Sequence, residues 1–329
     1  MPLLTILVPA FNEQDNLPLL YDRLHPVVEQ LRPKVECEVI VLDNCSEDRT
    51  REVALQLCAR DPAWRYVRYS KNFGYHGSLA CGFDIAHGDA LVVLASDLQE
   101  PPELIPQLVE LWQKGADVVY GVLDKRRDDN ILKTLGAKIF YRLFYWLSDC
   151  DMPLYASDYR IISRRVVDVL RGMREPDRYL RGLVHWVGFR QVPVPYDRDK
   201  RVHGESSAGL WVSTKWAFNA IICFSHKPLR AMAYFGGLII LASIALGAFF
   251  VWTRFYPSSF LPAPPTGTTA IALILLFGIG LNAMFLGIIG EYVGRIYNQG
   301  KQRPLYVIDE TFNVAAESGR ERVQSAARE

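Results

Sequence analysis

Short apolar runs alternate with amphipathic stretches over roughly the first 195 residues of the chain. The apolar runs have the length of β-strands and are Leu3–Val8, Glu38–Leu42, Arg65–Tyr69, Ala90–Leu94 and Asp117–Tyr120. Helix-like patterns fill the intervals, at Asn12–Leu31, Glu47–Arg60, Gly77–Ala86 and Glu103–Lys114. Repeated strand–helix alternation predicts an α/β fold with a mainly parallel sheet covered on both faces, and such sheets bind ligands at the carboxyl ends of their strands.

The pattern changes after Arg230, where charge disappears for long stretches. Ala231–Thr253 carries no charged residue, and neither does Phe255–Gly290, which begins with a proline-rich loop. Each remaining apolar segment is long enough to cross a bilayer core of ~30 Å. The sequence therefore predicts two transmembrane helices, at about 231–253 and 268–292. A pair of buried helices in a water-soluble protein is the structural alternative.

Basic residues flank the two predicted spans on one side. Lys227 and Arg230 precede the first span, Arg295 and Lys301 follow the second, and the connecting loop carries only Arg254. The positive-inside rule then places both termini and the α/β domain in the cytoplasm. The six cysteines match no metal or disulfide framework, which agrees with a reducing compartment. The net charge of +1 gives no indication of a nucleic-acid partner.

These patterns divide the chain into four parts. Residues 1–205 form the predicted cytoplasmic domain, 206–228 an amphipathic segment at the membrane interface, 229–297 the two spans, and 298–329 a cytoplasmic tail. The interfacial segment has an alternative interpretation as a packing helix of the soluble domain. Within the tail, Arg303–Glu310 is predicted to be a strand that pairs with a sheet edge of its own or of a neighbouring domain.

Polar side chains that can do chemistry follow the predicted strands. Asn12 and Glu13 come after the first, Asp43 after the second, and Asp97 with Gln99 after the fourth. On an extended segment Asp97 and Gln99 would point to the same side, and their oxygens suit Mg²⁺ or Mn²⁺. Helix capping by Asn12 and an acidic turn at Asp97 are the structural alternatives.

Two further signals combine acidic and basic residues. Asp158 and Arg160 are expected side by side at a strand edge, either as reacting groups or as a surface ion pair. The basic loop with Arg198 and Arg201 precedes the membrane-facing part, and a second cationic loop contains Arg126. Arginine matches phosphate geometry, so the basic loop is expected to hold a phosphate or to face lipid headgroups.

The motifs VPAFNE, VLDNCSEDRT, SDLQEPPELI, SDYRI and RVHGESS, with IGEYVGRIYNQGKQRPLY after the second span, together resemble glycosyltransferase family 2. The branch they resemble makes polyprenyl-phosphate sugars, and the QxxRW motif of processive synthases is absent. The resemblance implies a GT-A fold, a divalent metal and a homotetramer. It departs from the family pattern at Asn44, at Ala95-Ser96 and at Ser207, where acidic or basic residues are common.

The resemblance also implies residue roles. A nucleotide-sugar, expected to be UDP-linked, would be held by Pro9, Asn12, Glu13, Asp43, Asp97 and Arg126. Asp97 and Gln99 would hold the metal. Asp97, Asp158, Arg160 and Arg201 would form the catalytic centre, and Arg198, Arg201 and Ser206 would bind the lipid phosphate.

The expected reaction is an inverting transfer to a polyprenyl phosphate, undecaprenyl phosphate being the expected acceptor, at a bacterial inner membrane. The product would serve cell-envelope glycan or lipid modification. A non-catalytic membrane scaffold is the alternative from another class, and a transporter is disfavoured because the spans carry no internal charge. The sequence leaves the sugar open.

Overall fold

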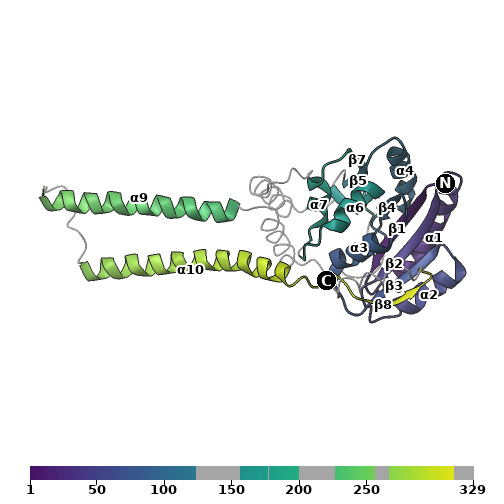
Figure 1. Ribbon diagram of the computed structural model, residues 1–329, viewed down its shortest axis with the longest axis horizontal. Helices are drawn as coiled ribbons and strands as arrows, with labels where there is room; N and C mark the ends of the chain where they lie inside the picture. The colour runs from purple at the N-terminus through teal and green to yellow at the C-terminus, as the bar shows by residue number, and fades with distance from the viewer. Residues whose placement is uncertain (124–155, 177, 200–226, 256–266, 315–329) are drawn as a thin grey trace. The chain divides into compact units, whose positions relative to one another are not determined.

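The computed structural model of the chain describes residues 1–123, 156–176, 178–199, 227–255 and 267–314 (Figure 1). The described residues fall into two compact units. The first contains the N-terminal α/β part together with the segment that begins at Arg303, and the second contains two long helices.

The first unit is a three-layer α/β structure. Its elements, in chain order, are β1 (Leu3–Ala10), α1 (Asn16–Leu31), β2 (Glu36–Asp43), α2 (Thr50–Arg60), β3 (Trp64–Tyr69), α3 (Gly74–Ile85), β4 (Ala90–Val93), the 3-10 turn η1 (Pro102–Leu104), α4 (Ile105–Gln113), β5 (Val118–Leu123), β6 (Ala156–Ser163), α6 (Arg164–Gly172), α7 (Leu180–Trp186), β7 (Gln191–Tyr196) and β8 (Ile308–Phe312).

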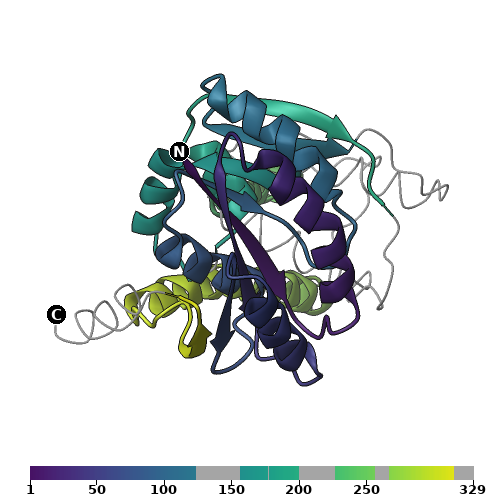
Figure 2. The same ribbon diagram turned by 90° about the vertical axis from the view of Figure 1, so that its right-hand side faces the viewer.

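One sheet of eight strands, in the order β7-β5-β6-β4-β1-β2-β3-β8, holds this unit together (Figure 2). Strands β1–β5 and β7 run in one direction, whereas β6 and β8 run against their neighbours. The predicted mainly parallel α/β sheet is therefore confirmed. All five predicted apolar runs are strands and all four predicted helical stretches are helices, with ends shifted by a few residues.

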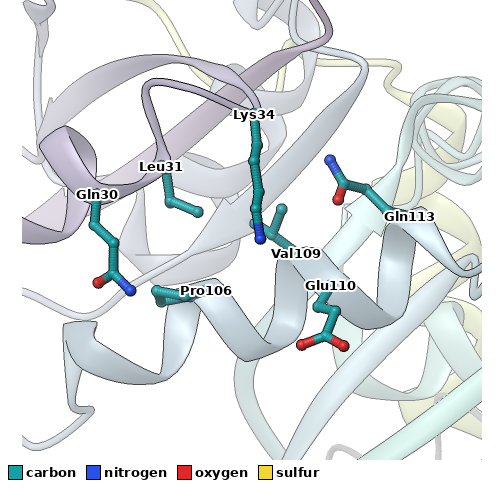
Figure 3. Close-up of a pocket in the computed structure, with 7 residues that line it drawn as sticks. All are labelled: Gln30, Leu31, Lys34, Pro106, Val109, Glu110 and Gln113. Carbon is teal, nitrogen blue, oxygen red and sulfur yellow. The ribbon is translucent and has the colours of Figure 1, made fainter.

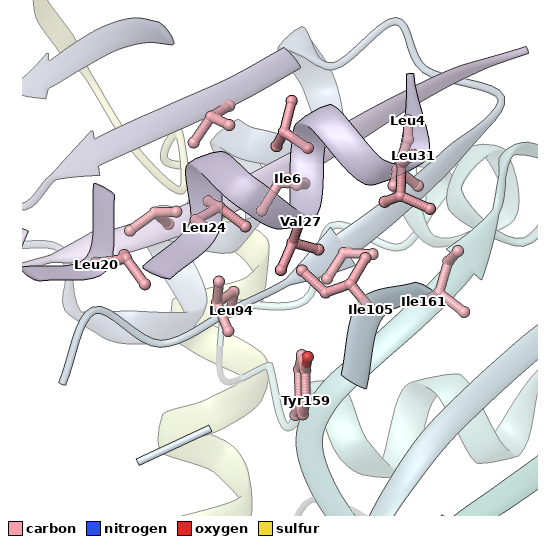
Figure 4. Packing of buried hydrophobic residues seen from close by; sticks show 14 of the residues in the cluster. Leu4, Ile6, Leu20, Leu24, Val27, Leu31, Leu94, Ile105, Tyr159 and Ile161 are labelled. Atoms are coloured by element: carbon pink, nitrogen blue, oxygen red, sulfur yellow. The ribbon is translucent and has the colours of Figure 1, made fainter. Parts of the chain in front are cut away.

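Alternating side chains of the central strands build the core on one face of the sheet. Leu4, Ile6 and Val8 of β1 are fully buried and pack in the cluster that includes Leu20 and Leu24 of α1 (Figure 4). Burial of each such side chain contributes about 1.5–3 kcal/mol. Helices α3, α6 and α7 contact strands from outside this cluster, so apolar faces are covered on both sides and the polar chemistry is left to the strand ends.

Strand β6, which runs antiparallel to its neighbours, was not predicted from the sequence. Its direction determines where Asp158 and Arg160 lie in the sheet. Arg160 is paired with Val93, the last residue of β4, and with Tyr120 of β5. Because β6 runs antiparallel to β4, its first residues lie at the carboxyl end of β4. Asp158 and Arg160 thus lie on an interior strand of the sheet, level with the carboxyl end of β4.

The C-terminal strand β8 closes the opposite edge of the sheet. It pairs antiparallel with β3, with Tyr66 opposite Phe312. The Arg51 guanidinium donates to both carboxylate oxygens of Glu310, at 2.8 Å each. The predicted tail strand thus begins at Ile308, five residues later than Arg303, and pairs with the sheet of its own chain.

Helix α3 lies close to the sheet because Gly82 has no side chain. A Cβ atom there would stand 2.8 Å from Cδ1 of Leu7 and 2.8 Å from Cδ1 of Leu42. Gly82→Ala is therefore expected to lower the free energy of unfolding by about 1–3 kcal/mol, through overpacking. Thermal denaturation measures this effect. Gly172→Ala is the matched control, since nothing lies within 4 Å of a Cβ at that position, and a similar loss there would contradict the packing argument.

The second unit contains α9 (Lys227–Phe255) and α10 (Gly267–Gly300). Large apolar side chains along both helices are exposed, from Leu229 to Trp252 and from Ile271 to Tyr297. Among the described residues, one helical segment is long and apolar enough to cross a membrane, Phe277–Gly300. It begins nine residues after the predicted start of the second span. The apolar stretch within α9, Leu229–Ala245, is shorter, so only one of the two predicted spans meets this criterion.

Candidate active site

The loops after β1 and β2 are bound to each other at the carboxyl end of the sheet. The Asn12 backbone N–H donates to Ser46 Oγ at 3.0 Å, and Asn12 Oδ1 accepts from the Glu47 N–H at 2.9 Å. The Glu13 N–H donates to Thr50 Oγ1 at 2.8 Å. Asn12 has a φ of 56°, a left-handed conformation that asparagine tolerates better than most residues. These polar side chains therefore shape the loops in addition to any role toward a ligand.

Asp43, at the end of β2, has a fully buried carboxylate with four protein donors. Oδ1 accepts from the Ser46 N–H and hydroxyl, at 2.9 and 2.6 Å. Oδ2 accepts from the Tyr66 hydroxyl at 2.6 Å and from Arg68 Nη1 at 3.0 Å. A carboxylate offers about four acceptor positions, so this one is saturated. In this arrangement Asp43 fixes the loop and orients Arg68, a residue that the sequence analysis did not single out.

Asp97 lies on a tight turn after β4. The sequence prediction of an extended segment is wrong, because buried Leu98 between Asp97 and Gln99 has a φ of 60°. A branched apolar residue in this conformation is costly, and such strain is common at functional sites. The turn is connected to the β1 loop by Ser96, whose hydroxyl donates to the Pro9 carbonyl at 2.9 Å.

The Asp97 carboxylate is partly exposed and makes one local hydrogen bond, from the Gln99 N–H to Oδ1 at 3.2 Å. Within the described residues, no group of three or more His, Cys, Asp or Glu side chains is arranged to hold a metal ion. One carboxylate with an amide oxygen fits a hard cation whose other ligands are substrate phosphates and water. The Asp97 carboxylate and the Gln99 amide are donor types that suit Mg²⁺ or Mn²⁺ bound together with a diphosphate, and the contact between the two residues is made by the Gln99 backbone N–H.

Glu100 joins the Asp97 turn to β6, and the sequence analysis missed it. Its Oε2 accepts from the Ala95 N–H at 3.1 Å, and its Oε1 accepts from the Ser157 hydroxyl at 2.9 Å. The Tyr196 hydroxyl donates to Ser157 Oγ at 2.9 Å. Burial raises the pKa of Glu100 to about 7. This buried network fixes the start of β6 against the turn after β4.

Asp158 is held by two arginines on the face of β6 opposite to Ser157. Arg181 of α7 donates through Nε and Nη2 to the two carboxylate oxygens, at 2.8 and 2.7 Å. Arg160 Nη2 lies 3.4 Å from Oδ1. Burial alone would raise the pKa of Asp158, but Arg181, and then Arg160, lower it to about 2. Asp158 is thus a permanent anion near neutral pH, and Arg160, which is only 1% exposed, is not in a surface ion pair.

The segment after β7 also reaches the Asp97 turn. The Asp199 N–H donates to the Gln99 carbonyl at 3.1 Å, which places exposed Arg198 next to the same turn. The structure thus joins the Asp97 turn to the β1 loop through Ser96, to β6 through Glu100 and to Arg198 through Asp199. Three other predicted site residues, Arg126, Arg201 and Ser206, lie outside the described residues.

His185 of α7 provides a test of burial on this side of the sheet. Burial, followed by the charge of Arg160, lowers its pKa to about 4 from an ordinary 6.5. The unfolded state therefore binds the extra proton between pH 6.5 and 4, and stability falls as the pH falls through this window. Wild type is expected to lose about 1–3 kcal/mol relative to His185→Asn between pH 7.5 and 4.5. Chemical denaturation of both proteins at the two pH values measures this difference. If the two proteins lose the same unfolding free energy between pH 7.5 and 4.5, the expectation is contradicted.

A small surface pocket between α1 and α4 lies apart from these groups (Figure 3). It is lined by Gln30, Leu31, Lys34, Pro106, Val109, Glu110 and Gln113. These residues come from the C-terminal end of α1, the turn after it, and α4, rather than from the strand ends. None of the residues predicted to do chemistry lines it.

Comparison with known proteins links the chain to enzymes of sugar transfer. The family model described as "Glycosyl transferase family 2" matches residues 5–171. An uncharacterized glycosyltransferase of Bacillus subtilis, YkcC, is 37% identical over 94% of this chain and 94% of its own length. The bactoprenol glucosyl transferase of Shigella phage SfV is 33% identical over 93% of this chain and 97% of its own.

A similar solved structure is a glucosyl-3-phosphoglycerate synthase from Mycobacterium tuberculosis in complex with uridine diphosphate. Its TM-score is 0.45 at 21% identity, and the match covers 68% of this chain and 79% of that one.

Proposed function

Because this chain belongs to glycosyl transferase family 2 and is a glycosyltransferase, we propose that it transfers a sugar from a nucleotide-sugar to a polyprenyl phosphate. The expected donor is UDP-linked, with glucose as the first sugar to test, and the expected acceptor is undecaprenyl phosphate. The product, a polyprenyl-phosphate sugar, would serve cell-envelope glycan or lipid modification.

One observation carries this proposal. Relatives named as bactoprenol glucosyl transferases match 93% of the chain, a share that extends well beyond the α/β part. Conservation of the family domain alone would leave the acceptor open, since family 2 enzymes use many acceptors. A match that includes most of the C-terminal third supports a lipid acceptor.

On the donor side, the joined loops of Pro9, Asn12 and Glu13 would form the wall of the nucleotide site, with Arg126 as a phosphate contact. Asp43 would act by fixing this wall, since its carboxylate is already saturated by protein donors. Asp97 and Gln99 would hold a Mg²⁺ or Mn²⁺ ion and, through it, the diphosphate. When bound, the ion supplies Lewis-acid neutralisation of the leaving diphosphate.

On the acceptor side, Arg198, Arg201 and Ser206 would hold the lipid phosphate next to the sugar. A phosphomonoester has a second pKa of ~6, so its oxygen is ionised near pH 7 and needs little help from a base. That oxygen attacks the anomeric carbon while the bond to the diphosphate breaks, with inversion. Asp158, with both oxygens held by Arg181, would orient arginine groups rather than remove a proton.

Both long helices would lie in a bacterial inner membrane. Their exposed apolar side chains need an apolar environment, and their basic flanks support a topology with the α/β unit and both termini in the cytoplasm. The division at 1–205, 206–228, 229–297 and 298–329 remains our proposal for the whole chain. A homotetramer is proposed as well, and mass measurement of the detergent-solubilised protein tests it.

The proposal is tested by incubating the purified protein with undecaprenyl phosphate, Mn²⁺ and a panel of nucleotide-sugars. Mass spectrometry of the lipid phase is expected to show one lipid that is heavier by one sugar. A non-catalytic scaffold would yield no new lipid and no hydrolysis of any donor, and that result would contradict the proposed function.

A further inference from the structure

Arg160 is buried, and two of its three guanidinium nitrogens make no hydrogen bond within the described residues. Its side chain is 1% exposed, and Nη2 donates to the Ser157 carbonyl at 2.7 Å and approaches Asp158 at 3.4 Å. Nε and Nη1 have no hydrogen-bond partner among the described residues. Buried guanidinium groups are normally fully paired, because a buried N–H without an acceptor is costly. The hydrogen bonds that Arg160 makes within the protein therefore do not offset the desolvation free energy of its buried guanidinium.

Among the residues that the structure describes, the charges around Arg160 do not balance. Asp158 is the acidic group on this face of β6, and Arg181 occupies both of its oxygens at 2.8 and 2.7 Å. Two guanidinium groups thus share one carboxylate. A buried charge without its own counter-ion is strongly destabilising. The cluster is therefore suited to receive an additional anion.

Two buried imidazole nitrogens without partners belong to the same neighbourhood. They are Nδ1 of His76, on α3, and Nε2 of His185, on α7. Burial lowers the pKa of both histidines; Asp158 opposes this effect at His76, and Arg160 is among the arginines that lower the pKa in each case. A neutral imidazole can donate one N–H to an anion without adding charge. Both histidines, one on α3 and one on α7, are thus within electrostatic reach of Arg160 on β6.

We propose that Arg160, Arg181, His76 and His185 form a subsite for a phosphate group. A planar guanidinium fork matches phosphate oxygens, and the negative charge of a phosphate would offset the single excess positive charge of the cluster. Access is from the rim, where the side chains of Asp158 and Arg181 are 18% and 36% exposed. Asp158 then acts as a positioning residue that holds Arg181. The inference rests on the proposed function, since that reaction brings the monophosphate of the acceptor and the diphosphate of the donor.

Binding to the purified full-length protein in detergent tests the subsite. The probes are farnesyl phosphate, a short polyprenyl monophosphate, and UDP, each titrated calorimetrically against wild type and Arg160→Gln. One probe is expected to bind the variant about 10- to 100-fold more weakly, since charged hydrogen bonds are lost, while the other keeps its affinity. A loss for farnesyl phosphate assigns the subsite to the acceptor, and a loss for UDP assigns it to the donor.

Arg164→Gln is the matched control, because Arg164 is also a partly buried arginine but donates to the Gly88 and Ala86 carbonyls. It is expected to leave both affinities within twofold. Equal affinities of wild type and Arg160→Gln for both probes would overturn the subsite. Should Arg160→Gln fail to fold, Arg160→Lys keeps the charge without the fork and is expected to weaken the same probe about 3- to 10-fold.

Inorganic phosphate separates failure of the subsite from failure of the proposed function. It is expected to raise the unfolding temperature of wild type, to raise that of Arg160→Lys less, and to leave that of Arg160→Gln unchanged. If wild type binds neither farnesyl phosphate nor UDP, the proposed function is contradicted, while protection by inorganic phosphate that depends on Arg160 still supports the subsite. If wild type binds neither probe and inorganic phosphate gives no such protection, the subsite is overturned as well.

Discussion

Replacing Asp97 by alanine is expected to lower sugar transfer by about a thousandfold or more. Asp97 is the carboxylate on the turn after β4, and the neighbouring Ala95 and Ser96 offer no second one. Loss of the group that holds the cation removes electrostatic stabilisation of the leaving diphosphate, and such groups contribute factors of ~10²–10³ or more. Radiolabelled sugar recovered in the lipid phase, measured with purified protein at saturating Mn²⁺, gives the rate.

Asp89→Ala is the matched control for this prediction. Asp89 lies just before β4, at the opposite end of the strand, where its Oδ2 accepts from the Leu3 N–H at 2.8 Å. Loss of this exposed hydrogen bond costs about 0.5–1.5 kcal/mol of stability and is expected to leave transfer within about threefold. Full activity of Asp97→Ala would refute the metal assignment.

Asp158→Asn and Arg181→Gln are each expected to lower kcat/KM for transfer about 10- to 100-fold, with some activity remaining. The two side chains form one bidentate unit, so removal of either releases the other from its position. The double variant is then expected to be little worse than the single ones, since residues that act as a unit are strongly non-additive. The values of kcat/KM for the two single variants and the double variant, compared with wild type, form a double-mutant cycle. Unfolding temperatures measured in parallel show whether each variant is folded.

The pH dependence of the same rates separates positioning from base catalysis. The pKa of Asp158 is about 2, because the arginines outweigh the effect of burial. Asp158 is therefore ionised at every pH from 5 to 9, and Asp158→Asn is expected to scale the rate without moving the pH profile. Two results would instead indicate that Asp158 acts as an independent base. One is a pH–rate profile of Asp158→Asn that lacks a fall in rate at low pH seen in wild type; the other is a rate loss in the double variant equal to the product of the two single losses.

The sequence predicted the elements well because the strand and helix periods are clear. Leu3–Val8 and Ala90–Leu94 are short apolar runs followed by polar residues, and both are buried parallel strands. From strand order alone the side chains at their ends could be expected to meet, and Ser96 does bind the Pro9 carbonyl. The tail strand was also visible, although its first residue was placed too early.

What the sequence could not provide depends on tertiary pairing. Arg181 lies 23 residues after Asp158 and on a different element, and nothing in the local pattern of α7 distinguishes it from a solvent-facing arginine. Glu100 looked like part of an acidic turn, yet it is buried and binds Ser157 across the site. A Gln two residues after an Asp suggested an extended segment, whereas Leu98 adopts a left-handed turn. Two of the four hydrogen bonds to the Asp43 carboxylate come from Tyr66 and Arg68 on the next strand, and the local sequence does not indicate them.

Binding of Mn²⁺ to the purified protein, followed by electron paramagnetic resonance with and without UDP, tests the central claim most directly. The account predicts tight binding only when the nucleoside diphosphate is present, because the chain supplies few ligands itself, and loss of that binding in Asp97→Ala but not in Asp89→Ala. Binding of Mn²⁺ that is independent of UDP, or that survives in Asp97→Ala, would contradict it.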